Sequence, residues 1–455
     1  MSSACSLYCR IACEIFLLAA SYFFYGCWDW RFLGLMLLST VIDFQCSKRI
    51  ADSADDDRRK RFLVISVVAN LAILGFFKYF NFFAESLQQL AASSGVQLNS
   101  TTLDIVLPVG ISFYTFQTMS YTIDVYRGDV RRLGSFLDFA LYVAFFPQLV
   151  AGPIERGSKL APQIQEGRRT SFCGLRDGTW LVTKGLFKKA VIADNLAPVV
   201  SSVFDLSQPT AAQVMIGVYA FAFQIYGDFS GYTDIARGIG RMLGYDLMLN
   251  FRLPYFATNP SEFWQRWHIS LSSWLRDYLY IPLGGNRGGT LLTYRNLMLT
   301  MLLGGLWHGA AWTFVLWGLF HGLLLVAHRS FAICWPWPER AMAFSYPLRV
   351  IGMFHLTCLG WLIFRANSVG HVVTMLKSLT VADFHLSLAD QQAAWKLLLL
   401  CGPLLLIQAG QQFTGNLNFV PSLSVLPRAA IYTATVMAIL TIGTFGQQQF
   451  IYFQF

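Results

Sequence analysis

The residue of greatest chemical interest is a histidine, His308, inside a long uncharged part of the sequence. No Asp, Glu, Lys or Arg occurs in the range 297–327, whereas His308 and His321 both lie in it. An ionisable side chain in an apolar segment is costly and usually faces a cavity or a polar partner. Burial favours neutral imidazole, which can accept a proton as a general base does. The alternative is a histidine that only hydrogen-bonds across helices.

The sequence around His308 predicts a pocket and a break in the helix. Trp307 and Trp312 flank the histidine and would wall such a pocket. A continuous helix over 297–327 would be about 46 Å long, and the hydrocarbon core of a bilayer is about 30 Å thick. We therefore expect a tilted or broken segment, and the glycines at 304, 305 and 309 offer the break. On an ideal helix His321 lies about 220° from His308, so we interpret His321 as structural.

A second candidate histidine, His268, occurs in the range 228–295, which is more polar than its surroundings and rich in Arg and aromatic residues. Helical spacing predicts one amphipathic helix from Ser261 to Tyr280, with an aromatic face that includes Trp267 and His268. The polar face carries Arg276 and Asp277. His268 is either structural or shares a cavity with His308, and spacing alone leaves this open.

Two acidic residues, Asp228 and Asp234, follow the apolar run 211–227. Either can orient a histidine through its carboxylate, or cap the end of a membrane segment. Other chemistries find little support, because the sequence has no GxxxxGK[ST] phosphate loop, no HExxH, no CxxC and no GxSxG. The glycine-rich stretch 284–289 is a weak nucleotide signal. We expect no metal site.

The composition indicates that much of the chain lies in lipid. Of its 455 residues 55% are hydrophobic and 13% charged, and the mean hydropathy is +0.48. Soluble proteins carry about 25% charged residues. The net charge of +9 comes from Lys and Arg in short loops between apolar runs, such as 58–61 and 127–132. This pattern is typical of cytoplasmic loops and argues against a nucleic-acid partner.

Apolar runs of about 20 residues predict membrane spans. The candidates are 12–28, 31–47, 62–84, 103–123, 136–153, 178–204, 211–227, 293–304, 309–328, 347–364, 393–409 and 427–446. Several are short or interrupted by Gly and Pro, which indicates re-entrant or broken helices that line a cavity or are packed within protein. We predict an all-α polytopic membrane protein with a single transmembrane domain over 1–455 and a catalytic core over about 105–330.

The longer motifs resemble those of the membrane-bound O-acyltransferase (MBOAT) superfamily, and in particular its bacterial branch, typified by the alginate O-acetylation membrane subunit. The resemblance extends from about Phe16 to the stretch 450–455. It rests on FWQRWHISLS (263–272), WLRDYLYIPLGGNRGG (274–289), GGLWHGA (304–310), LPVGISF (107–113), IDVYRG (123–128), FPQLVAGP (146–153), KKAVIAD (188–194) and DFSGYTD (228–234). Relatives usually carry another apolar segment before the one at 12–28, a departure that concerns the outer part of the fold.

The resemblance implies a fold and a site. The fold would be a ring of transmembrane helices with re-entrant or short helices around a central tunnel. The intramembrane histidine of the family matches His308, and the second motif histidine matches His268. We expect these two residues to be catalytic. The substrate tunnel would include Trp267, Arg276, Asp277, Asn286, Trp307 and Asp228, with Arg276, Asp277 and Asn286 at its cytoplasmic mouth.

The resemblance also implies a function. We expect a multi-pass protein of the bacterial inner membrane that passes acetyl groups from a cytoplasmic thioester donor for O-acetylation of a secreted exopolysaccharide of the alginate or cellulose type. The donor would be acetyl-CoA or another acyl thioester, with no tightly bound cofactor. The expected partners are membrane lipid, a periplasmic esterase-like acetyltransferase and the polysaccharide. Alternatives are peptidoglycan O-acetylation, D-alanylation of teichoic acid, and a non-enzymatic transporter or channel.

Overall fold

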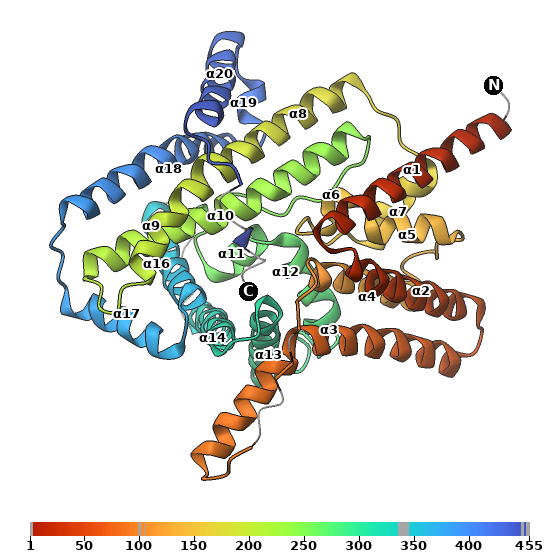
Figure 1. Ribbon diagram of the computed structural model, residues 1–455, viewed down its shortest axis with the longest axis horizontal. Coiled ribbons are helices and arrows are strands. Elements are labelled where there is room, and N and C mark those ends of the chain that lie inside the picture. Colours follow the sequence, from red (N-terminus) through yellow and green to blue (C-terminus); the bar gives the residue numbers. More distant parts are fainter. Residues whose placement is uncertain (1–2, 99–101, 104, 335–344, 447–449, 452–455) are drawn as a thin grey trace. The chain divides into compact units, whose positions relative to one another are not determined.

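The regular structure of this chain is helical. The computed structural model describes residues 3–98, 102–103, 105–334, 345–446 and 450–451, and within these ranges it contains no strand (Figure 1). The family resemblance was predicted to extend to the stretch 450–455. Residues 447–449 and 452–455 of that region lie outside the described residues. Six helices in the described ranges are long and apolar enough to cross a membrane. The chain is thus an all-α polytopic membrane protein, while the predicted ring and tunnel stay predictions.

The chain divides into two compact units. The first comprises residues 1–180 and 236–248, and the second comprises 181–235 and 249–455. The helices of the first unit are α1 (Ser3–Asp29), α2 (Arg31–Asp52), α3 (Asp56–Ser93), α4 (Ile111–Arg127), α5 (Phe136–Ala144), α6 (Phe146–Leu149) and α7 (Gly157–Glu166). Two helices, α8 (Phe172–Leu186) and α10 (Ala211–Met242), have residues in both.

The second unit contains both candidate histidines. Its elements are the π-helix η1 (Phe187–Ala193), α9 (Asp194–Phe204), the 3₁₀ turn η2 (Pro254–Phe256), α11 (Pro260–Arg266), α12 (Ile269–Leu275), the π-helix η3 (Arg276–Tyr280), α13 (Thr290–His308), α14 (Trp312–Cys334), α16 (Tyr346–Arg365), α17 (Val369–Val381), α18 (Leu388–Thr414), α19 (Phe419–Ser422) and α20 (Val425–Ile442). The spanning candidates are Arg10–Asp29 of α1 together with α3, α14, α16, α18 and α20.

In the first unit a buried polar network joins α2 to α3. The Asp43 carboxylate accepts from the hydroxyl of Ser66 at 2.5 Å and from the amide of Asn70 at 2.9 Å. The Asn70 oxygen in turn accepts from the hydroxyl of Ser39 at 2.9 Å. All four residues are buried. Because a buried polar group without a partner is costly, the network fixes how these two helices pair.

In the second unit α13 and α14 pack closely because glycines line their contact. A Cβ on Gly318 of α14 would clash with the Met301 carbonyl oxygen of α13, and a Cβ on Gly305 would clash with the Phe314 carbonyl oxygen. Small residues at such positions let two membrane helices approach backbone to backbone. The close approach fixes the position of the side chains on α14 against the end of α13, where His308 lies.

Every predicted span overlaps a helix, but some bounds were wrong. Span 103–123 becomes a helix only at Ile111, since Gly110 has a φ of +74° and ends the preceding loop. Span 211–227 continues to Met242 as α10. Its acidic residues do not end the helix because lysines neutralise them: Asp234 pairs with Lys188 at 2.7 Å and with Lys184 at 3.1 Å.

The glycine contact predicts opposite effects for two Gly→Ala substitutions. Gly318→Ala overpacks the α13–α14 contact and should lower the free energy of unfolding by about 1–3 kcal/mol. Gly352→Ala on α16 meets nothing within 4 Å and removes an unfavourable helix glycine, so it should raise stability by roughly 0.5–1 kcal/mol. Thermal unfolding of the purified variants in detergent measures both. Equal melting temperatures for the two variants would contradict the close packing.

Candidate active site

His308 is the last residue of α13, at a break between two helices. The chain turns to an extended conformation at Gly309, which has a φ of −165°, and α14 begins three residues later at Trp312. A side chain at 309 would clash with the Phe314 ring, so glycine is needed there. The predicted break in the run 297–327 is thus confirmed. The imidazole of His308 is 4% exposed.

The two candidate histidines meet. The ring centroids of His268 and His308 are 6.3 Å apart, and the ring planes form an angle of 57°. Trp307 contacts both imidazoles, with its centroid 5.8 Å from that of His268 and 5.1 Å from that of His308. These residues come from a polar stretch and an apolar helix that are far apart in sequence. The sequence left their meeting open, and the folded chain places them side by side.

Aromatic side chains form the surroundings of this histidine pair. On the side of His268, the ring of Phe229 lies 4.6 Å away in an edge-to-face contact. On the side of His308, the rings of Trp317 and Phe364 lie 5.0 Å and 5.5 Å away. Such walls have a low dielectric, in which hydrogen bonds and partial charges act more strongly than in water.

The backbone at His268 departs from the prediction of a continuous helix over 261–280. The helix breaks there into α11, α12 and η3, because His268 adopts a left-handed conformation with φ 44° and ψ 54°. A non-glycine residue in this region is strained by roughly 1–3 kcal/mol and needs support from its surroundings. The prediction of one continuous aromatic face over 261–280 is therefore wrong. The break turns His268 out of the helix register.

Asn250 supplies part of that support. Its carbonyl oxygen accepts from the Ile269 amide at 2.9 Å. Its side-chain Oδ1 accepts from the amide of Ser270 at 3.0 Å and from the hydroxyl of Ser270 at 2.9 Å. Asn250 is 0% exposed. These three bonds hold the two residues that follow His268 and so fix the turn that aims its imidazole.

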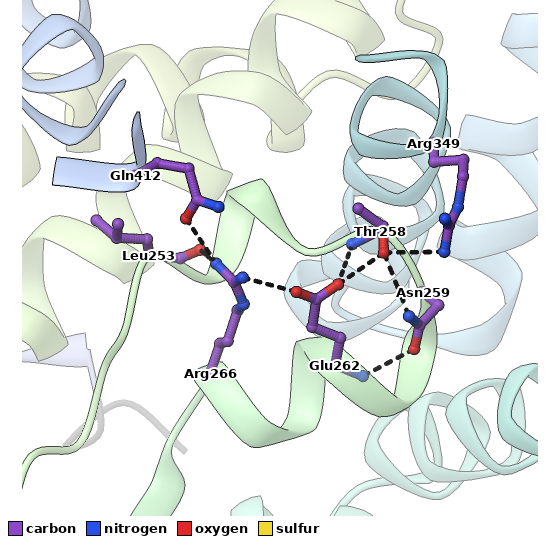
Figure 2. A network of polar contacts seen from close by, with 7 residues as sticks. All are labelled: Leu253, Thr258, Asn259, Glu262, Arg266, Arg349 and Gln412. Atoms are coloured by element: carbon purple, nitrogen blue, oxygen red, sulfur yellow. Dashed lines mark hydrogen bonds and ion pairs between the residues drawn. The ribbon is translucent and has the colours of Figure 1, made fainter. Parts of the chain in front are cut away.

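A second set of polar contacts braces α11, which leads into the turn (Figure 2). Glu262 accepts from the Thr258 amide and hydroxyl, both at 2.7 Å, and pairs with Arg266 at 2.6 Å. Arg266 also donates to Gln412 of α18 at 3.0 Å, and Arg349 of α16 donates to Thr258 at 3.1 Å. The brace thus ties α11 to two of the long helices.

Protonation states follow from these surroundings. Burial lowers the pKa of His268, which lies outside the six spanning helices, to about 3, so its imidazole is neutral near pH 7. For Glu262, burial raises the pKa of the carboxyl, but the donors on Thr258 and Arg266 lower it more, and it ends below the ordinary 4.5. The brace therefore carries a carboxylate, and the site beside it carries a neutral histidine.

Asp228 does not act as a cap at the end of a helix. It lies within α10, and its carboxylate pairs with Lys189 of η1 at 2.8 Å and accepts from the Ile451 amide at 2.6 Å. Lys189 also pairs with Asp194 at 2.7 Å. The next residue, Phe229, is the one that packs on His268. Asp228 thus anchors the segment 450–451 next to Phe229, whose ring packs on the histidine pair.

The remaining predicted residues divide into two groups. Trp307 belongs to the histidine pair, and Trp267 is 1% exposed and packs against Phe251 and Trp361, with centroids 4.9 Å and 4.8 Å away. Arg276 and Asp277 form a partly exposed ion pair at 2.7 Å on η3. Asn286 is exposed and accepts from Arg329 at 3.1 Å. The tunnel role of these last three residues stays a prediction.

Sequence reasoning missed several residues around the histidine pair. Trp317 and Phe364 gave no separate signal, because aromatic residues are common in every span. Asn250 and Glu262 lie in loops and short helices whose partners are distant in sequence. His321, interpreted as structural, packs on Trp317 with centroids 4.7 Å apart, one ring away from His308. Within the described residues no three His, Cys, Asp or Glu side chains form a group that could hold a metal ion.

Comparison with known proteins defines the class. Residues 129–364 match the model of the MBOAT, membrane-bound O-acyltransferase family, and this range includes both histidines. The chain therefore belongs to the membrane-bound O-acyltransferase family and is an acyltransferase.

The relatives of this chain add detail. A probable alginate O-acetylase AlgI of Azotobacter vinelandii is 47% identical over 357 residues, 78% of this chain and 70% of the relative. A probable alginate O-acetylase AlgI of Pseudomonas aeruginosa is 45% identical over 357 residues, 78% of this chain and 67% of the relative. A peptidoglycan O-acetyltransferase of Helicobacter pylori is 37% identical over 396 residues, 80% of this chain and 73% of the relative.

The brace predicts a pH-dependent contribution to stability. Because the pKa of Glu262 is lowered on folding, its carboxylate stabilises the protein above pH of about 4.5, and this contribution is lost as the pH falls below that value. The difference in melting temperature between wild type and Glu262→Gln should therefore be largest near pH 6–7 and shrink toward pH 3.

The matched control is Glu166→Gln, which breaks an exposed ion pair with Arg168 and should change stability little at any pH. Melting curves of the three proteins over pH 3–7 measure the effect. A difference for Glu262→Gln that is constant across this range would contradict the role given to the carboxylate.

Proposed function

We propose that this enzyme transfers acetyl groups from a cytoplasmic thioester donor, acetyl-CoA or an acyl carrier protein thioester, for O-acetylation of a secreted exopolysaccharide of the alginate or cellulose type. Family membership supports acyl transfer, and 45–47% identity to the alginate O-acetylases supports the acceptor class. The observation that carries the site assignment is the contact between His268 and His308 inside an uncharged aromatic surrounding.

In this proposal His308 is the general base. Its neutral imidazole takes the proton of the acceptor hydroxyl as the hydroxyl oxygen attacks the carbonyl carbon of the thioester. The tetrahedral intermediate collapses, the C–S bond breaks, and the proton on His308 passes to the leaving thiolate. The products are an acetyl ester and a free thiol. The acceptor hydroxyl belongs either to the polymer or to a relay nucleophile. General-base catalysis contributes typically 10²–10⁴-fold, about 3–5 kcal/mol of barrier.

His268 serves in this proposal to orient the substrate or to polarise the thioester carbonyl. Because burial keeps its imidazole neutral, it can donate one hydrogen bond without bringing a charge into the site. Its direction is set by the left-handed turn and by Asn250. A group held this rigidly loses little freedom when the substrate binds, which is how positioning residues lower a barrier.

We further propose the inner, cytoplasmic membrane of a bacterium as the location, with the Lys- and Arg-rich loops on the cytoplasmic side. Arg276, Asp277 and Asn286 would shape the cytoplasmic mouth, where a thioester donor enters. A periplasmic esterase-like partner would complete the transfer to the polymer. These assignments rest on family resemblance and loop charge. A comparison of acetyl-CoA with acetyl-acyl carrier protein as donors would identify which thioester the enzyme uses.

Among the alternatives, peptidoglycan O-acetylation is supported by the 37% identity to the Helicobacter pylori enzyme. The chemistry at His308 would be the same, and only the acceptor would differ. D-alanylation of teichoic acid would replace the acetyl donor by an aminoacyl thioester. Because the family is one of acyltransferases, a non-enzymatic transporter or channel is no longer a candidate.

The assignment predicts that His308→Ala lowers acetyl transfer by at least about 100-fold, the loss of a general base. Purified protein in lipid nanodiscs, given acetyl-labelled thioester and exopolysaccharide together with its partner, measures the transfer. The variant should still purify as a folded protein, since alanine removes a ring without adding a buried charge.

His385→Ala is the matched control, because His385 is exposed in the loop after α17 and should retain full activity. Equal expression and an unchanged gel-filtration profile establish that both variants are folded. Normal acetylation by folded His308→Ala would contradict the assignment of the general base.

A further inference from the structure

Trp317 of α14 packs on His308 and has no role in the mechanism above. Its indole is 1% exposed, and its centroid lies 5.0 Å from that of His308 with an interplanar angle of 82°. The ring also contacts Trp264 and His321, with centroids 5.6 Å and 4.7 Å away. Trp317 therefore lies between the proposed general base and a second aromatic layer.

The polar atom of this side chain is unusual. Among the residues that the structure describes, the buried indole Nε1 of Trp317 has no hydrogen-bond acceptor, and the same holds for Nε1 of Trp264 and of Trp361. His321 Nδ1 is likewise buried without a partner in the described ranges. Buried indole N–H groups usually have an acceptor, because leaving them unpaired is costly. The rings of Trp264, Trp317 and His321 contact one another, and unpaired nitrogens gathered in this way indicate that a ligand atom satisfies at least one of them.

The reaction needs such a donor. As the acceptor oxygen attacks the thioester, negative charge develops on the carbonyl oxygen, and enzymes meet this charge with preorganised hydrogen-bond donors. The range 297–327, which includes most of α13 and the first part of α14, contains no Lys or Arg. A neutral N–H beside His308 is the kind of group that can act there without the desolvation cost of a cation.

We propose that Trp317 is a further catalytic residue, whose indole N–H donates to the carbonyl oxygen of the transferred acyl group and stabilises the oxyanion of the tetrahedral intermediate. This role rests on the proposed acyl transfer at His308. The ligand chemistry it implies is a small thioester carbonyl.

The close packing of α13 and α14 makes this donor rigid. Gly318, the residue after Trp317, lies against the Met301 carbonyl of α13. The indole is also enclosed by Phe364 and Trp361, with centroids 5.4 Å and 6.2 Å away. A donor that cannot reorient loses little freedom when charge develops on the substrate, which is the condition for a large electrostatic effect.

The test compares two substitutions at one position. Trp317→Phe keeps an aromatic ring but removes the N–H, and it should lower kcat about 100-fold with less than a threefold change in KM for the acetyl thioester. Trp317→His is smaller than phenylalanine yet keeps a ring N–H, and it should be at least tenfold more active than Trp317→Phe. Trp395→Phe, the same change in an exposed indole of α18, is the control and should stay within threefold of wild type.

Each outcome decides the proposal. Higher activity in Trp317→Phe than in Trp317→His, with gel filtration showing both folded, would mean that the ring and not its N–H matters, and would overturn it. The same holds for a folded Trp317→Phe with wild-type kcat. If Trp317→Phe does not fold, the kcat of Trp317→His decides: within about tenfold of wild type it supports the donor, and a full loss overturns it. Wild-type protein without transfer from any acyl thioester would instead overturn the proposed function itself, and the oxyanion role with it.

Discussion

The site depends on one contact above all others, the glycine-lined approach of α13 and α14. With any other residue at 305 or 318, the added Cβ would clash with a backbone carbonyl of the facing helix. His308 ends one of these helices and Trp317 lies on the other, so their ring contact follows directly from this approach. Lipid offers no hydrophobic driving force for helices to associate, and packing of small residues is one of the forces that holds them. The close packing at these two glycines thus determines how His308 and Trp317 are placed.

A second constraint acts on the polar part of the site. Asn250, Glu262 and Arg266 hold the chain on either side of His268 with hydrogen bonds and an ion pair. In a low-dielectric interior such networks are strong when complete and costly when broken. These networks keep His268 in its left-handed conformation, which is strained for a residue other than glycine. A histidine on an uninterrupted helix would follow the helical register, whereas this turn sets its direction independently.

Much of the fold could be predicted from sequence, because span length and apolarity are properties of a contiguous segment. The helices and the break at Gly309 follow from local composition. The predictions that failed depend on contacts between residues distant in sequence. The helix expected over 261–280 breaks at His268, which periodicity cannot detect since the helical spacing of apolar residues continues on both sides of it. Asp228 was expected at the end of a helix, but Lys189 neutralises it from a distant segment. Whether His268 meets His308 was also undecidable, because spacing within a segment carries no information about pairing between segments.

The bond between Asp228 and the Ile451 amide has a consequence for biosynthesis. The two residues are separated by 223 positions, and Phe229 beside Asp228 forms one wall of the histidine pair. During translation α10 emerges long before the segment that completes its hydrogen bonding. This wall therefore reaches its final state only after residue 451 has been synthesised, so the site matures late relative to the synthesis of α10.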